Sequence, residues 1–479
     1  MTEDDTGVIE VESAHLDVSE GQASEAFPMD LDMQATLPTQ IAIKKHRRQY
    51  IKPINAIDRS NQIQFRVQSS LQELIVPQDC YLEIICSITN PDGNAYPLQA
   101  NNAYNPQNNV IPVNNVANSI FKNIHIKIND TPLQGGTDNM YPYRVDFETR
   151  LMQPQHVKKG SNLRLTGFLE EEASYDAVHG NLNFAQADEH AVPPAENWQL
   201  HKRYLWGKAG KRMYFATSLH SEIFDQPKPL PPNTEMFITF ERTDNDHFPL
   251  MTPRGNDNYK ISLHSARMSV RYITLDEEIL AGMIESMKKE PALFPLRYVK
   301  MSYFTKLQNT SDFSEVNILK GSSTLPRRIF AAVVRQDAFN GSKARDPFTY
   351  PDIAFKRVSL KVGGQYEPLE ELEINRTEQV DYLQQCMALQ EATGSMWDEG
   401  LGIHPDNIGN RSMFWAWDLT PSKVPPGQLY ELPNNKTLDL DMHIDVPLQE
   451  TYTLIVYKEY DAEIEIDEVG KVSMKTFGA

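Results

Sequence analysis

Two short patterns of histidine and acidic residues could bind a metal ion. His220 and Glu222 form a His-x-Glu pattern, and His443 and Asp445 form a His-x-Asp pattern. Iron oxygenases combine such a pair with a later histidine to form a facial triad with open coordination positions. His443 is the last histidine of the chain, so its triad cannot close, whereas His220 and Glu222 could close one with His264. Because glutamate is the rarer acid in such triads, we expect exposed or capping histidines instead.

Other catalytic patterns are incomplete. A zinc deaminase would need a Pro-Cys-x-x-Cys pattern besides the His-x-Glu pair, and a nucleotide-binding P-loop would need GxxxxGK[ST]; the sequence has neither. Residues 337–348 contain Asp337, Lys343 and Asp346 but no nucleophile beside a base, so we interpret them as a strand end that turns through Asn-Gly. We predict no catalytic residue, no cofactor, no metal ligand and no enzyme activity.

Residues 137–152, TDNMYPYRVDFETRLM, are unusually rich in aromatic and charged side chains. A helix over 143–152 would place Tyr143, Phe147 and Leu151 on one stripe, whereas a strand would place all the charges on one face. We favour a helix that crosses the end of a sandwich and begins at Pro142.

The charges in this segment are spaced so that they can pair with each other. On a helix, Arg144 would reach Glu148 and Asp146 would reach Arg150, each four residues further along. Such pairs are typical of a solvated helix face. We therefore predict that this segment is scaffold and needs no substrate.

Composition narrows the class of protein. The chain has 479 residues, which is enough for two or three domains. Its small number of cysteines, three, fits a reducing compartment. It has no long apolar run that could span a membrane, and its N-terminus does not resemble a signal peptide. With 46 basic and 65 acidic residues the net charge is −19, which argues against a nucleic-acid contact over the whole surface.

The charge is unevenly distributed at the N-terminus. Residues 1–40 contain ten Asp and Glu and no Lys or Arg, and few large apolar residues, so we expect a disordered arm. Residues 43–52, IKKHRRQYIK, form the densest basic cluster. This cluster could contact a nucleic acid or a partner, or it could be a solvated hinge that neutralises the arm; we favour the hinge.

Most of the chain alternates between apolar and polar residues in short runs separated by Pro, Gly, Asn and Asp. This pattern predicts antiparallel β-sandwiches. The expected strands are 61–68, 80–89, 121–129, 234–243, 260–273, 327–335, 355–362, 437–446 and 451–466. One clear helix is expected at 274–291, with a capping box from Thr274 to Glu277 and a stop at Pro291.

The two halves of the chain repeat the same order of blocks. Residues 121–134 resemble 355–369, and 219–240 resemble 417–442 in layout. Each half then closes on a long strand. These recurrences indicate one β-sandwich that has been duplicated, with the mid-chain helix as connector.

Five segments together resemble the major capsid proteins of Polinton/Maverick (adinto-like) elements, which have a double jelly-roll fold. The segments are VNNVANSIFKNIHIKINDTPLQ, YPYRVDFETRLM, AAVVRQDAFNGSKARDPFTY, MFWAWDLTPS and YTLIVYKEYDAEIEID. At the end of the first segment, PLQGG (132–136) loosely resembles a cleavage site of adenovirus-type proteases, but we interpret it as a turn.

The resemblance implies an all-β protein of two tandem eight-stranded jelly rolls. It also implies homotrimeric, pseudo-hexagonal capsomers that bind neighbouring capsomers and a penton protein in an icosahedral virion. The virion would enclose double-stranded DNA without sequence-specific contact, and the protein would be made in the host cytoplasm or nucleus and not secreted. The alternatives are a metal-dependent jelly-roll enzyme and a host-domesticated element protein that keeps the fold without forming virions.

The expected domains follow from these patterns. They are a disordered acidic arm (1–45), a first jelly roll (46–275) with a loop insertion (153–213), a connecting helix (276–291), a second jelly roll (292–470) and a tail (471–479). We expect the trimer contact in the insertion 153–213 and in residues 376–412, which contain Trp198, Trp206 and Trp397.

Deletion of residues 1–40 should leave the melting temperature of the protein unchanged. The segment has no periodic apolar pattern with which to pack on a core. Calorimetry of the truncated and full-length proteins checks this. A fall of several degrees in the truncated protein would show that the segment packs on the core.

Overall fold

Antiparallel strands dominate the structure, which is a computed structural model. One unit spans Ile43–Ala479, and a separate unit, Met1–Ala42, precedes it. The structure describes residues 39–57, 60–93, 110–133, 139–170, 198–252, 259–306, 312–319, 324–374, 381–396, 400–424 and 429–477. The predicted arm lies almost entirely outside these residues, as does most of the PLQGG segment.

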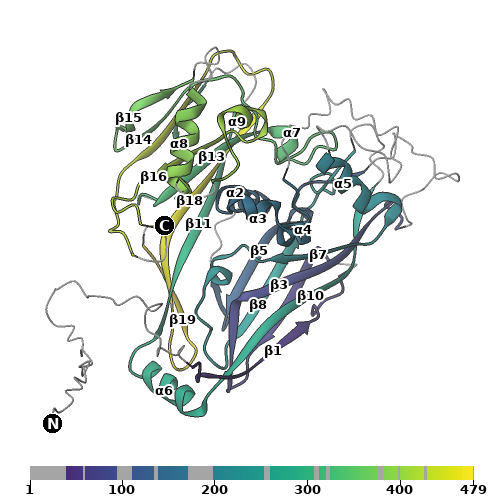
Figure 1. Cartoon of the computed structure of the whole chain (residues 1–479), viewed down its shortest axis with the longest axis vertical. Helices are drawn as coiled ribbons and strands as arrows, with labels where there is room; N and C mark the ends of the chain where they lie inside the picture. The colour runs from purple at the N-terminus through teal and green to yellow at the C-terminus, as the bar shows by residue number, and fades with distance from the viewer. Residues whose placement is uncertain are drawn as a thin grey trace, which may run out of the picture. The chain divides into compact units, whose positions relative to one another are not determined.

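The first half of the chain forms an eight-stranded sandwich of two four-stranded sheets (Figure 1). The sheet orders are β1-β10-β3-β7 and β2-β8-β5-β6, and every pairing is antiparallel. The strands are β1 (Ile43–Ile51), β2 (Gln62–Gln68), β3 (Glu73–Thr89), β5 (Phe121–Ile128), β6 (Thr131–Leu133), β7 (Met213–Ser218), β8 (Glu235–Arg242) and β10 (Lys260–Leu275).

The second half repeats this arrangement. Its sheet orders are β11-β18-β13-β16 and β12-β17-β14-β15. The strands are β11 (Ala292–Lys306), β12 (Asp312–Asn317), β13 (Arg328–Arg335), β14 (Phe355–Val362), β15 (Gln365–Glu373), β16 (Phe414–Asp418), β17 (Leu438–Ile444) and β18 (Tyr452–Ile466).

The two sheet orders match strand for strand when the eight strands of each half are counted along the chain. In both halves the first strand pairs with the eighth, the eighth with the third and the third with the sixth. The predicted duplication of an eight-stranded jelly roll is confirmed. Three short strands are additional: β4 (Ile111–Pro112) pairs with β9 (Leu250–Met251), and β19 (Val472–Phe477) pairs with β18.

The first and last strands lie outside the limits expected for the two rolls. β1 begins at Ile43, within the expected arm, and β19 lies within the expected tail. The basic cluster therefore forms an edge strand, and eight of the nine residues of β1 are exposed. A strand with both faces in solvent shows no alternation of apolar and polar residues, which is why the pattern of 43–52 did not reveal it.

Each roll carries a helical insertion between its fifth and sixth strands. In the first roll it follows β6 and contains α2 (Tyr141–Leu151), α3 (Gln155–Lys159), α4 (Ser161–Leu165) and α5 (Trp198–Gly207). In the second roll it follows β15 and contains α8 (Asp381–Thr393) and α9 (Pro405–Arg411). These two insertions fall within the predicted loops 153–213 and 376–412, or directly before them. Two shorter helices, α1 (Val116–Ser119) and α7 (Gln336–Phe339), each follow the third strand of a roll.

The connecting helix is α6 (Glu277–Met287). Its N-cap is Asp276, whose side chain accepts a hydrogen bond from the amide of Glu278, so the predicted cap at Thr274 is wrong. Thr274 is instead the penultimate residue of β10, opposite Lys45 of β1. The capping-box spacing was misleading because the strand continues two residues beyond the expected helix start. Among the residues that the structure describes, no helix is long and apolar enough to cross a membrane.

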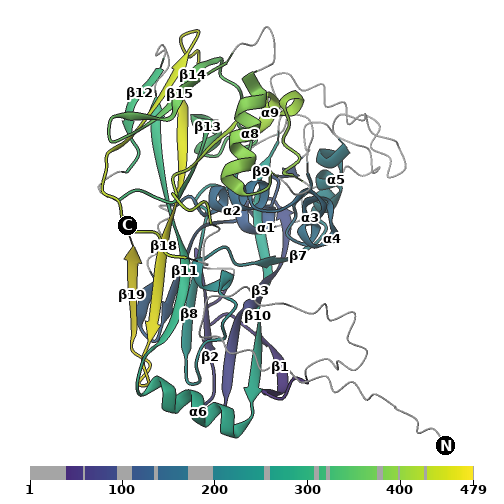
Figure 2. The ribbon, with the colours of Figure 1, turned by 60° about the vertical axis from the view of Figure 1, so that its left-hand side comes forward.

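The two rolls share their cores. β11 and β18 form a long ribbon that runs from the second roll alongside the first (Figure 2). Near the start of β11, Phe294, Leu296 and Tyr298 pack in the core of the first roll, whereas Val299 and Met301 pack in the core of the second. The far end of the β18–β19 hairpin contacts the first roll, where the side-chain amide of Asn129 donates to the carbonyl of Gly470 at 2.8 Å.

Cleavage of the connection between the rolls should not separate them. A protease site inserted at Gly282 of α6, where an added Cβ would meet no atom within 4 Å, would cut the chain on its surface. We expect the fragments to co-elute in size-exclusion chromatography and to unfold in one calorimetric transition, because each contributes apolar side chains to both cores. The uncut insertion variant is the control. Fragments that separate without denaturant would contradict the shared cores.

Candidate functional site: a buried charged helix between the two rolls

Helix α2 is buried along its whole length. All eleven of its residues are buried, and Figure 1 shows it where the two rolls meet. Tyr143, Phe147 and Leu151 pack in the core of the second roll, whereas Tyr141 and Val145 pack in the core of the first. The predicted helix and its apolar stripe are confirmed. The helix has a second apolar face as well, so it acts as a wedge between two cores.

The charged side chains of α2 pair as expected, but they do not lie on a solvated face. The Nε atom of Arg144 donates to Glu148 at 3.0 Å, and the Nε atom of Arg150 donates to Asp146 at 3.1 Å. The exposed fractions of the four residues lie between 0% and 8%, so the predicted solvated face is wrong. Arg144 also donates to Glu222 of the first roll at 2.8 Å. Spacing in the sequence predicted the pairs but could not show that a second roll covers them.

Glu148 is the centre of the network. Its carboxylate accepts hydrogen bonds from Arg144, from Arg297 of β11 at 3.2 Å and from the hydroxyl of Tyr457 of β18 at 3.1 Å. The Nδ1 atom of His220 lies 2.6 Å from its other oxygen. Burial alone would raise the pKa of Glu148, but Arg144, Arg297 and His220 hold the pKa well below its usual value. Glu148 is therefore an ionised carboxylate that joins both rolls.

Arg297 extends the network through the second roll. It pairs with Asp225 at 2.9 Å and with Glu459 of β18 at 3.2 Å, besides its contact with Glu148. Glu459 is fully buried and also pairs with Arg328 of β13. Burial opposes the charge of Glu459, but Arg328 and Arg297 lower its pKa. Charges of opposite sign thus alternate from α2 into the sheet of the second roll.

The other end of α2 is held by the second roll as well. Asp146 accepts a hydrogen bond from the hydroxyl of Tyr350 at 2.8 Å. Arg150 donates to the carbonyl of Phe348 at 3.0 Å and lies 3.5 Å from the hydroxyl of Ser412. Burial raises the pKa of Asp146 although Arg150 and Tyr350 oppose the shift. Each charge on α2 therefore has a partner outside the helix, and most of these partners belong to the second roll.

The candidate triad of the His-x-Glu pattern, which we did not favour, does not come together. His220 contacts Glu148, and Glu222 accepts from Arg144 and from the amide of Val299. The Nε2 atom of His264 lies 2.7 Å from the hydroxyl of Ser87 in another part of the first roll. Within the described ranges, no group of three or more His, Cys, Asp and Glu could hold a metal ion.

The second candidate loop, residues 337–348, forms structural contacts. Asp346 pairs with Arg411 at 3.2 Å and caps the amide of Phe348, while Asp337 pairs with Arg345 at 3.0 Å. The loop turns at Gly341, whose φ of 88° favours glycine, as the Asn-Gly pattern predicted. The three cysteines are buried, and burial raises the pKa of each thiol to about 12, so they remain protonated at neutral pH.

Of the three tryptophans expected at a subunit contact, the structure places one side chain. Trp206 packs against Phe215 of β7 with ring centroids 6.1 Å apart and is half-buried. The side chain of Trp198 and the whole of Trp397 lie outside the described residues. Sequence reasoning missed Arg297 and Tyr457, because nothing in their neighbourhood along the chain links them to α2.

Comparisons with known proteins identify the fold. No protein-family model matches the chain. An uncharacterized protein of Caenorhabditis elegans is 22% identical over 447 residues, which cover 90% of this chain and 97% of that protein. A chain of the cryo-EM structure of the Sputnik virophage aligns with a TM-score of 0.63 at 15% identity, covering 96% of this chain and 94% of that one.

Two further solved structures cover nearly the whole chain. The mavirus major capsid protein aligns with a TM-score of 0.50 at 12% identity over 97% of both chains. The Faustovirus major capsid protein aligns with a TM-score of 0.52 at 9% identity, covering 91% of this chain and 94% of that one. This chain has a double jelly-roll fold. At these identities the likeness establishes the fold, and the predicted fold class is confirmed.

Replacement of Glu148 by Gln should destabilise the protein by about 3–5 kcal/mol, because it leaves Arg144 and Arg297 buried without their shared carboxylate. Denaturant unfolding at pH 7 measures this loss. The matched control is Asp244→Asn, which breaks the exposed pair with Lys122 and should change stability by less than about 1 kcal/mol.

The same variant should change the pH dependence of stability. The pKa of Glu148 is depressed in the folded state, so its contribution is present above the unfolded value of about 4.3 and is lost as the pH falls through the folded value. Stability of the wild-type protein should therefore decline more steeply below about pH 4.3 than that of Glu148→Gln. Parallel curves for the two proteins would contradict the central role of Glu148.

Proposed function

We propose that this protein is a major capsid protein of a Polinton/Maverick-type element. Its copies associate into trimers of pseudo-hexagonal outline, and these capsomers tile an icosahedral shell around double-stranded DNA. The main support for this proposal is that two rolls with the same strand order are joined in one chain. Each chain would contribute two similar rolls, so three chains would place six similar rolls around the trimer axis. Six similar units around an axis suit a hexagonal lattice.

The comparisons support this proposal. The Sputnik virophage, mavirus and Faustovirus structures resemble the chain over more than nine-tenths of its length, and two of them are named as major capsid proteins. The buried charges of α2 also favour a structural role, because they pair with each other and with charges of the two rolls. A shell protein acts by binding neighbouring capsomers and a penton protein, and it would touch DNA without reading its sequence, as the net charge of −19 suggests.

The insertions between the fifth and sixth strands are the best candidates for the trimer contact. In the first roll the insertion supplies the wholly buried helix α2, whereas in the second roll α8 has exposed apolar residues. Leu383 and Met387 lie one turn apart on α8 and are 50% and 47% exposed. Such a pair on a helix suits a contact with another copy, which must be heterologous around a three-fold axis.

One observation favours a second candidate. The relative in Caenorhabditis elegans aligns with 90% of this chain and over 97% of its own length, so an animal encodes a protein that resembles this one nearly end to end. A host-domesticated element protein would keep the double jelly roll and its trimer but would form no virion. Electron microscopy of the purified protein distinguishes the two, since only the capsid protein should assemble into closed shells.

The protein should be a trimer of about three times 54.7 kDa by light scattering, independent of dilution in the micromolar range. Substitution of Leu383→Asp together with Met387→Asp should shift the mass toward the monomer while the circular dichroism spectrum stays unchanged. The control is Ile284→Asp on α6, which is also partly exposed and should leave the trimer intact.

Two outcomes would contradict this proposal. A monodisperse wild-type monomer at micromolar concentration would exclude the capsomer. Stoichiometric iron or zinc in elemental analysis, lost in His220→Ala, would favour the metal-dependent enzyme instead.

A further inference from the structure

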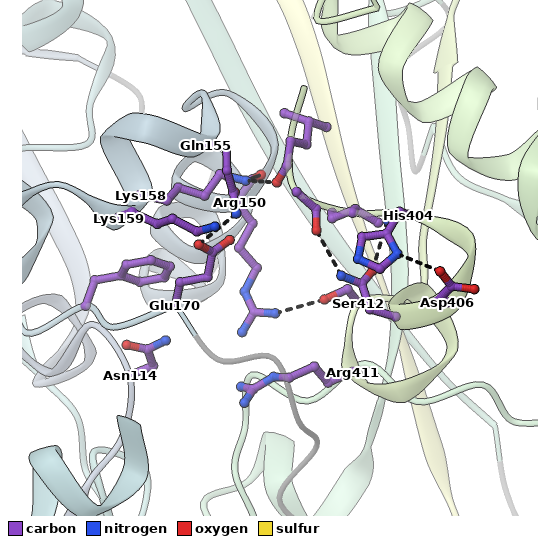
Figure 3. A pocket seen from close by; sticks show the side chains of 15 residues that line it. Asn114, Arg150, Gln155, Lys158, Lys159, Glu170, His404, Asp406, Arg411 and Ser412 are labelled. Atoms are coloured by element: carbon purple, nitrogen blue, oxygen red, sulfur yellow. Dashed lines mark hydrogen bonds and ion pairs between the residues drawn. The ribbon is translucent and has the colours of Figure 1, made fainter. Parts of the chain in front are cut away.

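A cavity of about 470 Å³ lies between the helical insertions of the two rolls. Arg150 of α2 and Lys158 and Lys159 of α3 line it from the first roll, and Arg411 of α9 lines it from the second (Figure 3). Clefts that bind small molecules have volumes of roughly 300–1,000 Å³. The cavity is thus large enough for a ligand bigger than a water molecule, and four of its lining side chains are cationic.

Two buried guanidinium groups face this space. Arg150 and Arg411 are 8% and 1% exposed, and Figure 3 shows both reaching into the cavity, with the amide of Asn114 beside them. Arg150 pairs with Asp146 through its Nε atom, and one terminal nitrogen of Arg411 lies 3.2 Å from Asp346. Both guanidinium groups also donate to the backbone carbonyl of Phe348, Arg150 at 3.0 Å and Arg411 at 3.4 Å, so the two cations share one neutral acceptor.

The lysines add to this positive charge. Lys158 is buried and donates to the backbone carbonyls of Arg150 and Leu401, so its direct partners are neutral. Burial lowers its pKa to about 8. Burial and the neighbouring Arg150 also hold the pKa of Arg411 well below its usual value. Burial is the larger cause of both pKa shifts, and the positive charge of Arg150 adds to each.

Two acidic side chains, Glu170 and Asp406, also line the cavity. Glu170 accepts from the side chain of Gln155 at 3.0 Å, and burial raises its pKa. Asp406 lies 3.5 Å from His404 and is largely exposed at the rim. Of the six Asp, Glu, Lys and Arg side chains that line the cavity, four are thus cationic.

We propose that this cavity binds a phosphate-type tetrahedral oxyanion, free or as the terminal group of a small metabolite, between Arg150 and Arg411. Guanidinium groups bind phosphate oxygens in pairs of parallel hydrogen bonds, and the two arginines approach from different walls. Lys158 and Lys159 supply further positive charge. Because Arg150 and Arg411 belong to different rolls, the anion joins the two insertions and stabilises the folded protein by mass action.

Thermal unfolding and calorimetric titration of the full chain with inorganic phosphate test this site at constant ionic strength, set with sodium chloride. We expect saturable stabilisation and one phosphate per chain. A parallel titration with adenosine monophosphate identifies the source. Equal affinity means that the free anion is recognised, and tighter binding of the nucleotide means that the rest of the cavity contacts the metabolite. Stabilisation that does not saturate, or equal stabilisation by acetate, would overturn the proposal.

A matched pair of variants locates the site. Lys159 is exposed at the cavity, so Lys159→Glu should leave the protein folded and weaken phosphate binding about tenfold or more, as loss of a charge-assisted contact implies. The control, Lys289→Glu, makes the same charge change on the surface after α6 and should leave affinity unchanged. Equal weakening in both variants would show a general effect of charge and would overturn the assignment. Arg411→Lys should also weaken binding, because it keeps the charge but removes the planar fork.

Discussion

The charges of α2 must be neutralised inside the protein, and this requirement fixes how the two rolls meet. Two cations and two anions at i,i+4 spacing make the helix neutral, so it can enter a core without net charge. Its remaining hydrogen-bonding capacity has to be met by groups around it. Those groups come from β11, β18 and the loops of both rolls, and they meet Glu148 and Asp146 in one arrangement. A shift of one roll against the other would leave buried ions without partners, which costs far more than an altered apolar contact.

Apolar burial and ion pairing have different roles in joining the two rolls. The ribbon of β11 and β18 supplies apolar side chains to both cores and so holds the rolls together. Apolar contacts are not directional, so they do not by themselves fix the position of one roll relative to the other. The directional contacts of Glu148, Arg297 and Glu459 then fix this relative position. The two rolls are therefore joined both by shared apolar cores and by directional ion pairs.

The sequence predicted the features that depend on neighbours along the chain. Strands with one buried face, such as β2 and β8, alternate clearly, and the i,i+4 pairs of α2 were evident from spacing. β11 was missed because its residues serve two cores, so apolar, aromatic and charged side chains are mixed along it. The burial of α2 was missed for a related reason. Its cover is formed by residues 200 to 300 positions away, such as Tyr350 and Tyr457, and nothing local indicates that they converge.

The two rolls carry helical insertions at the same position, after the fifth strand, but the helices of these insertions differ in exposure. The insertion after the fifth strand became an internal wedge in the first roll, where α2 is wholly buried, but in the second roll α8 covers β16 and still exposes Leu383 and Met387. A helix that is wholly buried in its own chain cannot also bind a neighbour, whereas one with an exposed apolar pair can. The two rolls are therefore alike in their strands and unlike in their surfaces. In the proposed trimer, three copies would present six similar rolls but two distinct kinds of contact.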